Sequence, residues 1–222
     1  MTGHTTRVTA VAASPLADTA ASADESGVVL FHDIRAPKPT ATLRTPARAT
    51  VAFDEQGIVV AVAADAAHVK IFSAKAPGGD AQFPAPVVEL ALGPAFGGAV
   101  RPDALAFEPA GRWLAAAGGG ALAVLDAFRS QPPLAVARPG PPPPGCPPLR
   151  PAFSPDGEYV ASGCDDCAVR AWRVRDGGAP PPAAEWAGHA DAPSALAWAP
   201  GRHLVAAGCH ALALWAPGGG GV

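Results

Sequence analysis

Short runs of apolar or alternating apolar and polar residues recur along the chain and predict β-strands. Each run is closed by Gly, Pro, Asp or similar turn residues, and none has the length of an ordinary helix. The runs fall into five groups of three: Val8–Ala13, Thr19–Ala23 and Val28–Asp33; Thr50–Phe53, Ile58–Ala63 and His68–Phe72; Ala104–Phe107, Trp113–Ala117 and Leu122–Asp126; Leu149–Phe153, Tyr159–Ser162 and Val169–Trp172; Ser194–Trp198, His203–Ala207 and Ala211–Trp215.

The turns between the first and second strands of these groups resemble one another. Pro and Gly preset a tight chain reversal, and every one of these turns contains at least one of them. The turns are Ser14-Pro15, Phe53–Gly57, Phe107–Gly111, Phe153–Gly157 and Trp198–Gly201. The agreement indicates an internal repeat.

The repeat has the period of a propeller blade. The third strands end at Asp33, Ser73, Asp126, Arg173 and Ala216, which gives spacings of 40, 53, 47 and 43 residues by subtraction. Such a period is typical of a four-stranded blade. We therefore expect an all-β chain forming one region over 1–222, with copies at about 3–44, 45–86, 99–138, 147–187 and 188–217, a Pro-rich loop at 139–148 and a Gly-rich tail at 218–222.

Several segments resemble WD-repeat signatures: Gly3-His4, Gly188-His189, the turn Phe153–Gly157 and the segment Ser162–Arg173. The resemblance implies a WD-repeat β-propeller in which a His, a strand Ser, a turn Asp and a Trp form a buried relay. In the first copy Ser26 stands at the expected place of the Asp and His32 at that of the Trp. The structural relay residues that the resemblance implies are His4, Ser22, Asp33, Asp166, Trp172, His189 and Trp215.

A narrower resemblance is to the WD-repeat protein 82 family, whose yeast relative is the Swd-two subunit of COMPASS. The segments that carry it are Gly3–Val8, Ser14-Pro15, Asp33–Pro37, Phe53–Ile58, Val69–Phe72, Leu125–Phe128 and Ala213–Pro217. This resemblance implies a seven-bladed, non-enzymatic nuclear scaffold, with the cytoplasm as the alternative location. Its partners would be subunits of histone H3 lysine-4 methyltransferase complexes or of assemblies for RNA polymerase II 3′-end processing and transcription termination.

Five blades are visible, and the match begins at about the family's third blade. A propeller blade pairs its three inner strands with an outer fourth strand, and little chain follows Trp215 or precedes His4 to provide one for the fifth copy. We therefore expect a ring truncated at its N-terminus, or an open arc of five blades.

Composition narrows the classes of function. Lys and Arg number 16 and Asp and Glu 19, so the formal charge of -3 disfavours direct nucleic-acid binding through phosphates. The uncharged stretch Trp113–Leu125 is broken by glycines and shorter than the roughly 20 residues of a membrane helix. The start of the chain has no signal-peptide pattern, and four cysteines are too few for a disulfide scaffold. We expect protein partners and no membrane association.

Two motifs have competing interpretations. Cys164 and Cys167 form a C-x-x-C pair that could bind zinc with Cys209 and His210, but equivalent positions in successive blades splay apart, so a substituted hairpin turn is the favoured interpretation. The segment 139–148 predicts a polyproline II loop, either as a blade connection or as a ligand for an SH3 or WW-type module. No motif indicates catalytic residues, and we expect no metal or cofactor.

Two arginines are candidates for partner surfaces. His32–Arg35 resembles the W-D-x-R box by which some WD-repeat proteins dock to cullin-RING ubiquitin ligases, so a substrate receptor is the alternative function. Arg35 would there pair with a carboxylate, and ordinary packing at a strand end is the competing interpretation. Arg7 is expected near one rim, where it either meets an acidic or phosphorylated partner or is solvated.

Overall fold

The computed structural model describes residues 3–65, 67–75, 85–93, 101–131, 133, 135–137, 150–164, 166–175, 181–193, 195–199, 205–208 and 212–215. No α-helix occurs within these ranges. The strands are β1 (Val8–Ala13), β2 (Thr19–Asp24), β3 (Val28–Asp33), β4 (Pro39–Arg44), β5 (Thr50–Phe53), β6 (Val59–Ala63), β7 (His68–Ser73), β8 (Val88–Ala91), β9 (Ala104–Phe107), β10 (Trp113–Gly118), β11 (Ala121–Asp126), β12 (Ala135–Ala137), β13 (Ala152–Phe153), β14 (Tyr159–Gly163), β15 (Val169–Arg173), β16 (Ala184–Trp186), β17 (Ala195–Trp198), β18 (Val205–Gly208) and β19 (Leu212–Trp215).

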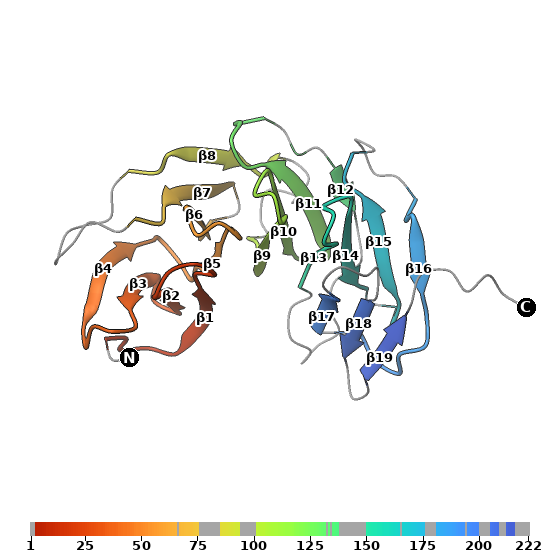
Figure 1. Cartoon of the computed structure of the whole chain (residues 1–222), viewed down its shortest axis with the longest axis horizontal. Helices are drawn as coiled ribbons and strands as arrows, with labels where there is room; N and C mark the ends of the chain where they lie inside the picture. The colour runs from red at the N-terminus through yellow and green to blue at the C-terminus, as the bar shows by residue number, and fades with distance from the viewer. Residues whose placement is uncertain are drawn as a thin grey trace, which may run out of the picture.

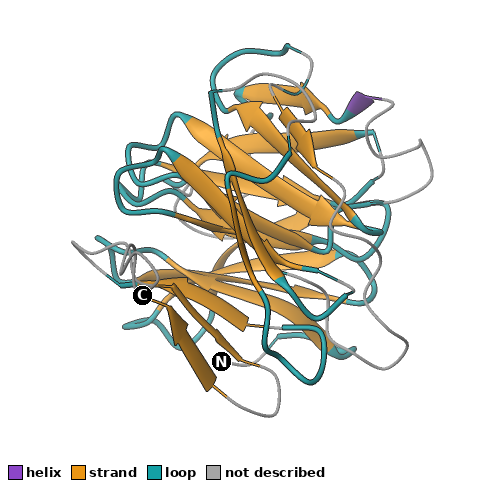
Figure 2. Cartoon of the chain, turned by 90° about the vertical axis from the view of Figure 1, so that its right-hand side faces the viewer, coloured by secondary structure: helices purple, strands orange, loops and turns teal. Residues whose placement is uncertain are grey.

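These strands form five antiparallel sheets whose strands follow in chain order. Four sheets have four strands each, and the described part of the fifth has three, β17 to β19. The first strands β1, β5 and β9 of neighbouring sheets pack side by side, and β13 packs against β17. The five sheets follow one another in an arc, with β1–β4 at one end and β17–β19 at the other (Figure 1). A view from the side shows the sheets stacked face to face (Figure 2).

The sequence analysis predicted no residue ranges for the fourth strands. In β4, Ala41 is buried against the core while its neighbours Thr40 and Thr42 are half-exposed. Pairing with only one neighbour leaves an outer strand with one edge open, so it needs fewer apolar residues than the strands inside the sheet. Its sequence signal is correspondingly weak, and β12 and β16 are only three residues long.

The turns between first and second strands connect neighbouring sheets. Gly57, Gly111 and Gly157 have φ angles of 61°, 76° and 71°, a conformation that glycine adopts without strain. A Cβ atom on Gly157 would lie 2.3 Å from Oε1 of Glu108, which belongs to the corresponding turn of the preceding sheet. Glycine is therefore required here for both its conformation and its size.

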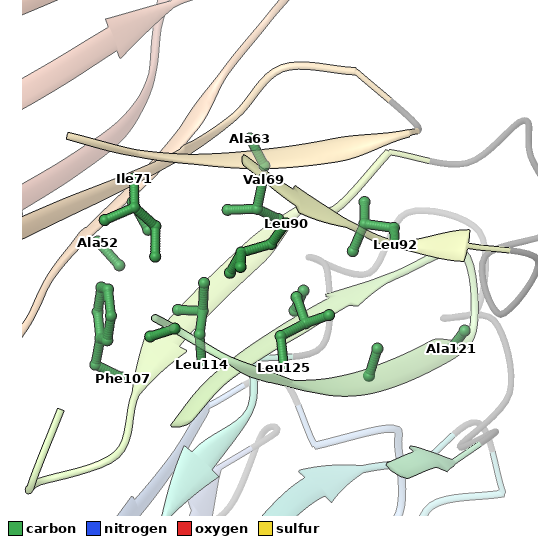
Figure 3. Close-up of a cluster of buried hydrophobic side chains, with 14 residues drawn as sticks. Ala52, Ala63, Val69, Ile71, Leu90, Leu92, Phe107, Leu114, Ala121 and Leu125 are labelled. Carbon is green, nitrogen blue, oxygen red and sulfur yellow. The ribbon is translucent and has the colours of Figure 1, made fainter. Parts of the chain in front are cut away.

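The core lies between the sheets rather than along a central axis. Four clusters of buried side chains join the first to the second sheet, the second to the third, the third to the fourth and the fourth to the fifth. In the cluster between the second and third sheets, Ile71 and Leu90 face Leu114 and Leu125 (Figure 3). Burying each of these leucines contributes roughly 2 kcal/mol, so these interfaces hold the sheets in a fixed order.

The outer faces of the first and fifth sheets have no such partner in the described part of the chain. Leu212 and Leu214 of β19 are mostly exposed, as is Val11 of β1. Beside Val11 the first sheet carries an open hollow of about 460 Å³ that His4, Ser22 and His32 also line.

Candidate functional site

A chain of hydrogen bonds crosses the outer face of the first sheet. His4, from the segment before β1, places Nε2 2.8 Å from Oγ of Ser22 on β2. The same hydroxyl lies 2.9 Å from Nε2 of His32 on the neighbouring strand β3. On its other side, Nδ1 of His4 lies 2.7 Å from Oδ2 of Asp24. These four side chains tie the N-terminal segment to the sheet.

The partners fix the direction of the protons when both imidazoles are neutral. An ionised carboxylate only accepts, so Nδ1 of His4 donates to Asp24. Nε2 of His4 then accepts the hydroxyl proton of Ser22, whose oxygen accepts from Nε2 of His32. Burial, reinforced by the nearby His4, lowers the pKa of His32 and favours its neutral form. The arrangement is a structural clasp, since its four side chains bind one another in sequence.

Asp24 is the carboxylate of this relay, which corrects the sequence expectation. Asp33 was one of the relay candidates, and Ser26 stood at the expected place of the turn Asp. In the structure Ser26 donates its amide and hydroxyl to Oδ1 of Asp24 at 2.9 and 2.6 Å. The backbone N–H of Val28 adds a third bond to the same oxygen at 3.1 Å. Burial alone would raise the pKa of Asp24, but the bonds from Ser26, His4 and Val28 outweigh it and hold that pKa well below its usual range.

Asp33 pairs with Arg35 instead. Nε and Nη2 of Arg35 donate to the two carboxylate oxygens at 2.9 and 2.8 Å, and the Arg35 amide donates to Oδ1 at 2.9 Å. The side-chain hydrogen bonds from Arg35, followed by its amide bond, lower the pKa of Asp33 to about 2. A second carboxylate, that of Asp18, lies 3.6 Å from Nη1 of Arg35. The guanidinium of Arg35 is therefore already engaged within this chain.

The remaining relay candidates lie in three separate places in the fourth and fifth sheets. Asp166 forms an ion pair with Arg170 on the outside of the fourth sheet, which lowers the pKa of Asp166. Trp172 is buried in the cluster between the third and fourth sheets. The ring of His189 packs edge-on against Trp215 at 5.2 Å between centroids.

The C-x-x-C pair shows no convergence of sulfur atoms. Cys164 is buried with Sγ 3.9 Å from the carbonyl of Ser162, while Sγ of Cys167 lies 3.8 Å from the carbonyl of Ala190. Cys167 has a φ of 66°, as a tight hairpin position requires. Cys209 and His210 lie outside the described residues, as do the Pro-rich loop 139–148 and the tail 218–222.

The two ends of the sheets differ in chemistry, and each end is defined by the direction of the first strands. The entry end is where the first strand of each sheet begins, and the exit end is where that strand finishes. One arginine precedes the first strand in each of four sheets at the entry end: Arg7, Arg48, Arg101 and Arg150. Three of them, Arg7, Arg48 and Arg150, line one cavity of about 220 Å³. Of the four, only Arg7 was singled out from the sequence, although an arginine shortly before each first strand is a readable signal.

The exit end carries exposed apolar side chains. Leu16 and Ile58 are in turns between first and second strands. Ile34 directly follows the third strand β3, and Phe128 comes two residues after the third strand β11; third strands run parallel to the first. All four are more than half exposed. Leu16 also packs near the glycine of the turn that contains Ile58. These four side chains are exposed at the exit end of the first three sheets and are available to a partner.

No group of three or more His, Cys, Asp or Glu side chains within the described ranges is arranged to hold a metal ion. No described helix has the length and apolar character that crossing a membrane demands.

Comparisons with known proteins agree with this architecture. Residues 150–173, which contain β13 to β15, match the family model described as "WD domain, G-beta repeat". "Protein ANTHESIS POMOTING FACTOR 1" of Arabidopsis thaliana is 28% identical over 219 residues, covering 98% of this chain and 62% of that protein. A chain of the solved "Crystal Structure of Mitotic Checkpoint Complex" superposes with a TM-score of 0.73 at 18% identity, covering 97% of this chain and 63% of that one.

The chain therefore spans less than two thirds of the length of either similar protein. The sheets, their connection order and the matched repeat nevertheless agree with one another. The fold of this chain is that of a WD-repeat β-propeller.

Proposed function

We propose that this chain is a non-catalytic scaffold of the nucleus, a subunit of a COMPASS-type histone H3 lysine-4 methyltransferase complex or of an RNA polymerase II 3′-end-processing assembly. The observation that carries the scaffold role is the exit end, where Leu16, Ile34, Ile58 and Phe128 present apolar side chains on short turns. These turns are fixed by the buried cores below them, so the surface is organised before a partner arrives.

The choice of complex rests on the resemblance to the WD-repeat protein 82 family. One segment of that resemblance, Leu125–Phe128, runs from the buried core to the exit end. Leu125 and Ala127 are buried, whereas Phe128 is mostly exposed. The segment therefore combines a packing role with a side chain that is available to a partner.

Affinity purification of the endogenous protein with a C-terminal tag, followed by mass spectrometry, tests this function. We expect lysine-4 methyltransferase or 3′-end-processing subunits to co-purify. Replacing Ile58 and Phe128 by Ser should remove them, because desolvating the added hydroxyls opposes apolar docking. The matched control is Leu212→Ser, an exposed apolar residue at the start of the third strand β19 and so at the entry end, which should leave them unchanged.

The cullin-RING substrate receptor is the competing result of the same purification. Because Asp33 and Asp18 already bind Arg35, the geometry favours a local role for this guanidinium. Recovery of cullin-ligase components that disappear with Arg35→Ala, with no methyltransferase or 3′-end subunits, would overturn the proposed function.

A further inference from the structure

We propose that the outer face of the fifth sheet binds the same face of a second copy of this chain, forming a dimer about a two-fold axis that runs along the strands. The face carries Ala195 and Ala197 of β17 and Leu212 and Leu214 of β19, and we call it the end face. The fifth sheet lies at one end of the arc of sheets (Figure 1). The proposed function does not use this surface.

Alternation along the strands shows which side chains form the end face. Leu196, Trp198 and Trp215 pack against the fourth sheet. Because successive residues of a strand point to opposite faces, the residues between them point away from the fourth sheet. Leu212 and Leu214 are accordingly 72% and 61% exposed. Two large apolar side chains thus stand on the outer face of one strand.

The four preceding sheets bury a face of the same composition against the sheet that follows. Pairing of the first three strands defines one row in each sheet whose first two residues are alanine and whose third is apolar. The rows are Ala12, Ala21 and Phe31; Ala52, Ala61 and Ile71; Ala106, Ala115 and Val124; Ala152, Ala161 and Ala171.

The end face continues this series without being covered by the described part of the chain. Its corresponding row is Ala197, Ala206 and Leu214. The third residue of each of the four earlier rows is at most 3% exposed, whereas Leu214 is 61% exposed. The end face therefore has the register and composition of a face that packs on another sheet.

The first sheet of a second copy is a poor match for it. Rows of alanine leave room that large residues on the facing sheet must fill. In the second to fifth sheets the facing row begins and ends with Phe53 and Phe72, Phe107 and Leu125, Phe153 and Trp172, or Trp198 and Trp215. The first sheet has Ala13, Ala20 and His32 in this row, beside its hollow of about 460 Å³. Stacking the two would set alanine against alanine.

The end face is instead complementary to itself. Pairing through β18 places Ala197 level with Leu214, and Ala195 level with Leu212. A rotation of 180° about an axis along β18 keeps each level and exchanges β17 with β19. Each leucine of one copy then lies over an alanine of the other, so large residues meet small ones on both sides. Such self-complementarity is what a two-fold interface requires.

The size and polarity of the end face set the expected strength of the dimer. The three strands have four residues each, and none of these residues is charged. Association therefore buries no unpaired charge within the strands. Interfaces of small area are typically weak, so we expect a reversible dimer with a dissociation constant of roughly micromolar order.

Sedimentation velocity of the full chain over a range of concentrations tests the dimer. The mass should rise from that of one chain to that of two and stop there. Leu214→Glu should raise the dissociation constant roughly a hundredfold or more, because two carboxylates would be buried in an apolar contact. The matched control is Val11→Glu, at a 66% exposed apolar residue of the first sheet, which should dimerise as the wild type does.

A pair of charges tests the register of the two copies. Ala197→Glu and Leu214→Lys should each abolish the dimer when made alone. Combined in one chain they should restore it, because the two-fold axis brings each Glu against the Lys of the other copy. Equal melting temperatures of all variants would show that they are folded.

Three results would overturn the two-fold contact: a monomer at every concentration, failure of the charge pair to restore the dimer, or masses above the dimer that Val11→Glu abolishes. The last result would mean that the fifth sheet packs on the first sheet of the next copy. Leu212→Ser should weaken the dimer but leaves the exit end intact, so loss of the dimer and loss of the co-purifying subunits are distinguished.

Discussion

Gly157 lies directly against Glu108 of the preceding sheet, so closely that a Cβ atom on Gly157 would be 2.3 Å from Oε1 of that carboxylate. Glu108 cannot move away without cost, because it is buried and its other oxygen accepts the amide of Arg112 at 3.1 Å. Two sheets whose residues are distant in the sequence are thus fitted together at a turn.

Gly157→Ala should therefore destabilise the fold more than its backbone conformation alone demands. We expect a loss of roughly 3 kcal/mol in the free energy of unfolding, from left-handed strain plus overpacking. Gly93 is the matched control, since its φ of 63° is similar but its Cβ would meet only Pro133 at 3.9 Å. Gly93→Ala should cost roughly 1 kcal/mol in the same denaturation experiment. Equal losses would contradict the contact with Glu108.

Replacing Asp24 tests the relay of the first sheet. Asp24→Ala removes the acceptor of four hydrogen bonds, from His4, Ser26 and Val28, at a site where the side chain is 1% exposed. We expect about 2 kcal/mol less stability toward denaturant. The neighbouring exposed Glu25, changed to Ala, should shift stability by less than about 0.5 kcal/mol.

The same carboxylate makes stability depend on pH. Because folding lowers the pKa of Asp24, its contribution is fully present above the unfolded value near 3.9 and is lost as the pH falls below it. Asp24→Asn should therefore flatten the decline in unfolding free energy between about pH 5 and pH 2. A decline as steep as that of the wild type would show that other carboxyl groups cause it.

Asp33 provides a direct titration. NMR should record a pKa of about 2 for its carboxyl group, which is held there by Arg35. In Arg35→Ala the pKa should rise toward the ordinary value near 3.9. An unchanged pKa in the variant would show that Arg35 does not bind Asp33 in solution, which would strengthen the case for a partner at Arg35.

Trp172 tests whether the cores between sheets hold the arc together. It is buried between the third and fourth sheets, so Trp172→Ala should cost about 3–5 kcal/mol. Phe128→Ala, an exposed aromatic residue in the preceding sheet, should cost less than about 0.5 kcal/mol in the same thermal or chemical denaturation. Comparable losses would mean that the exit end is itself part of the packed core.

The inner strands of the sheets could be predicted from the sequence because the polarity of their residues follows their burial. The run Ala121–Leu125 is apolar along its length because both of its faces are covered by neighbouring sheets. Outer strands such as β4 have one open edge and a weaker pattern, so their limits were set only by pairing with the third strand.

Prediction of the candidate sites was incomplete because it depends on distances between side chains, which a repeat pattern in the sequence does not contain. His4 and Ser22 were found from signatures, but Asp24 was missed because the choice between Asp24 and Asp33 depends on how the N-terminal segment lies across the sheet. Arg48, Arg101 and Arg150 were not singled out, although each of them shortly precedes a first strand. Only the side-by-side packing of those strands shows that Arg7, Arg48 and Arg150 line one cavity.

The central claim, a scaffold for lysine-4 methylation or 3′-end processing, is tested most directly by depleting the protein and measuring both outputs. Quantitative mass spectrometry of histone H3 and sequencing of transcript 3′ ends would be compared after rescue with the wild type and with the Ile58→Ser, Phe128→Ser double variant. We predict that lysine-4 trimethylation or 3′-end formation falls on depletion and recovers only with the wild type. If both stay unchanged on depletion, or the double variant restores them fully, the account is contradicted.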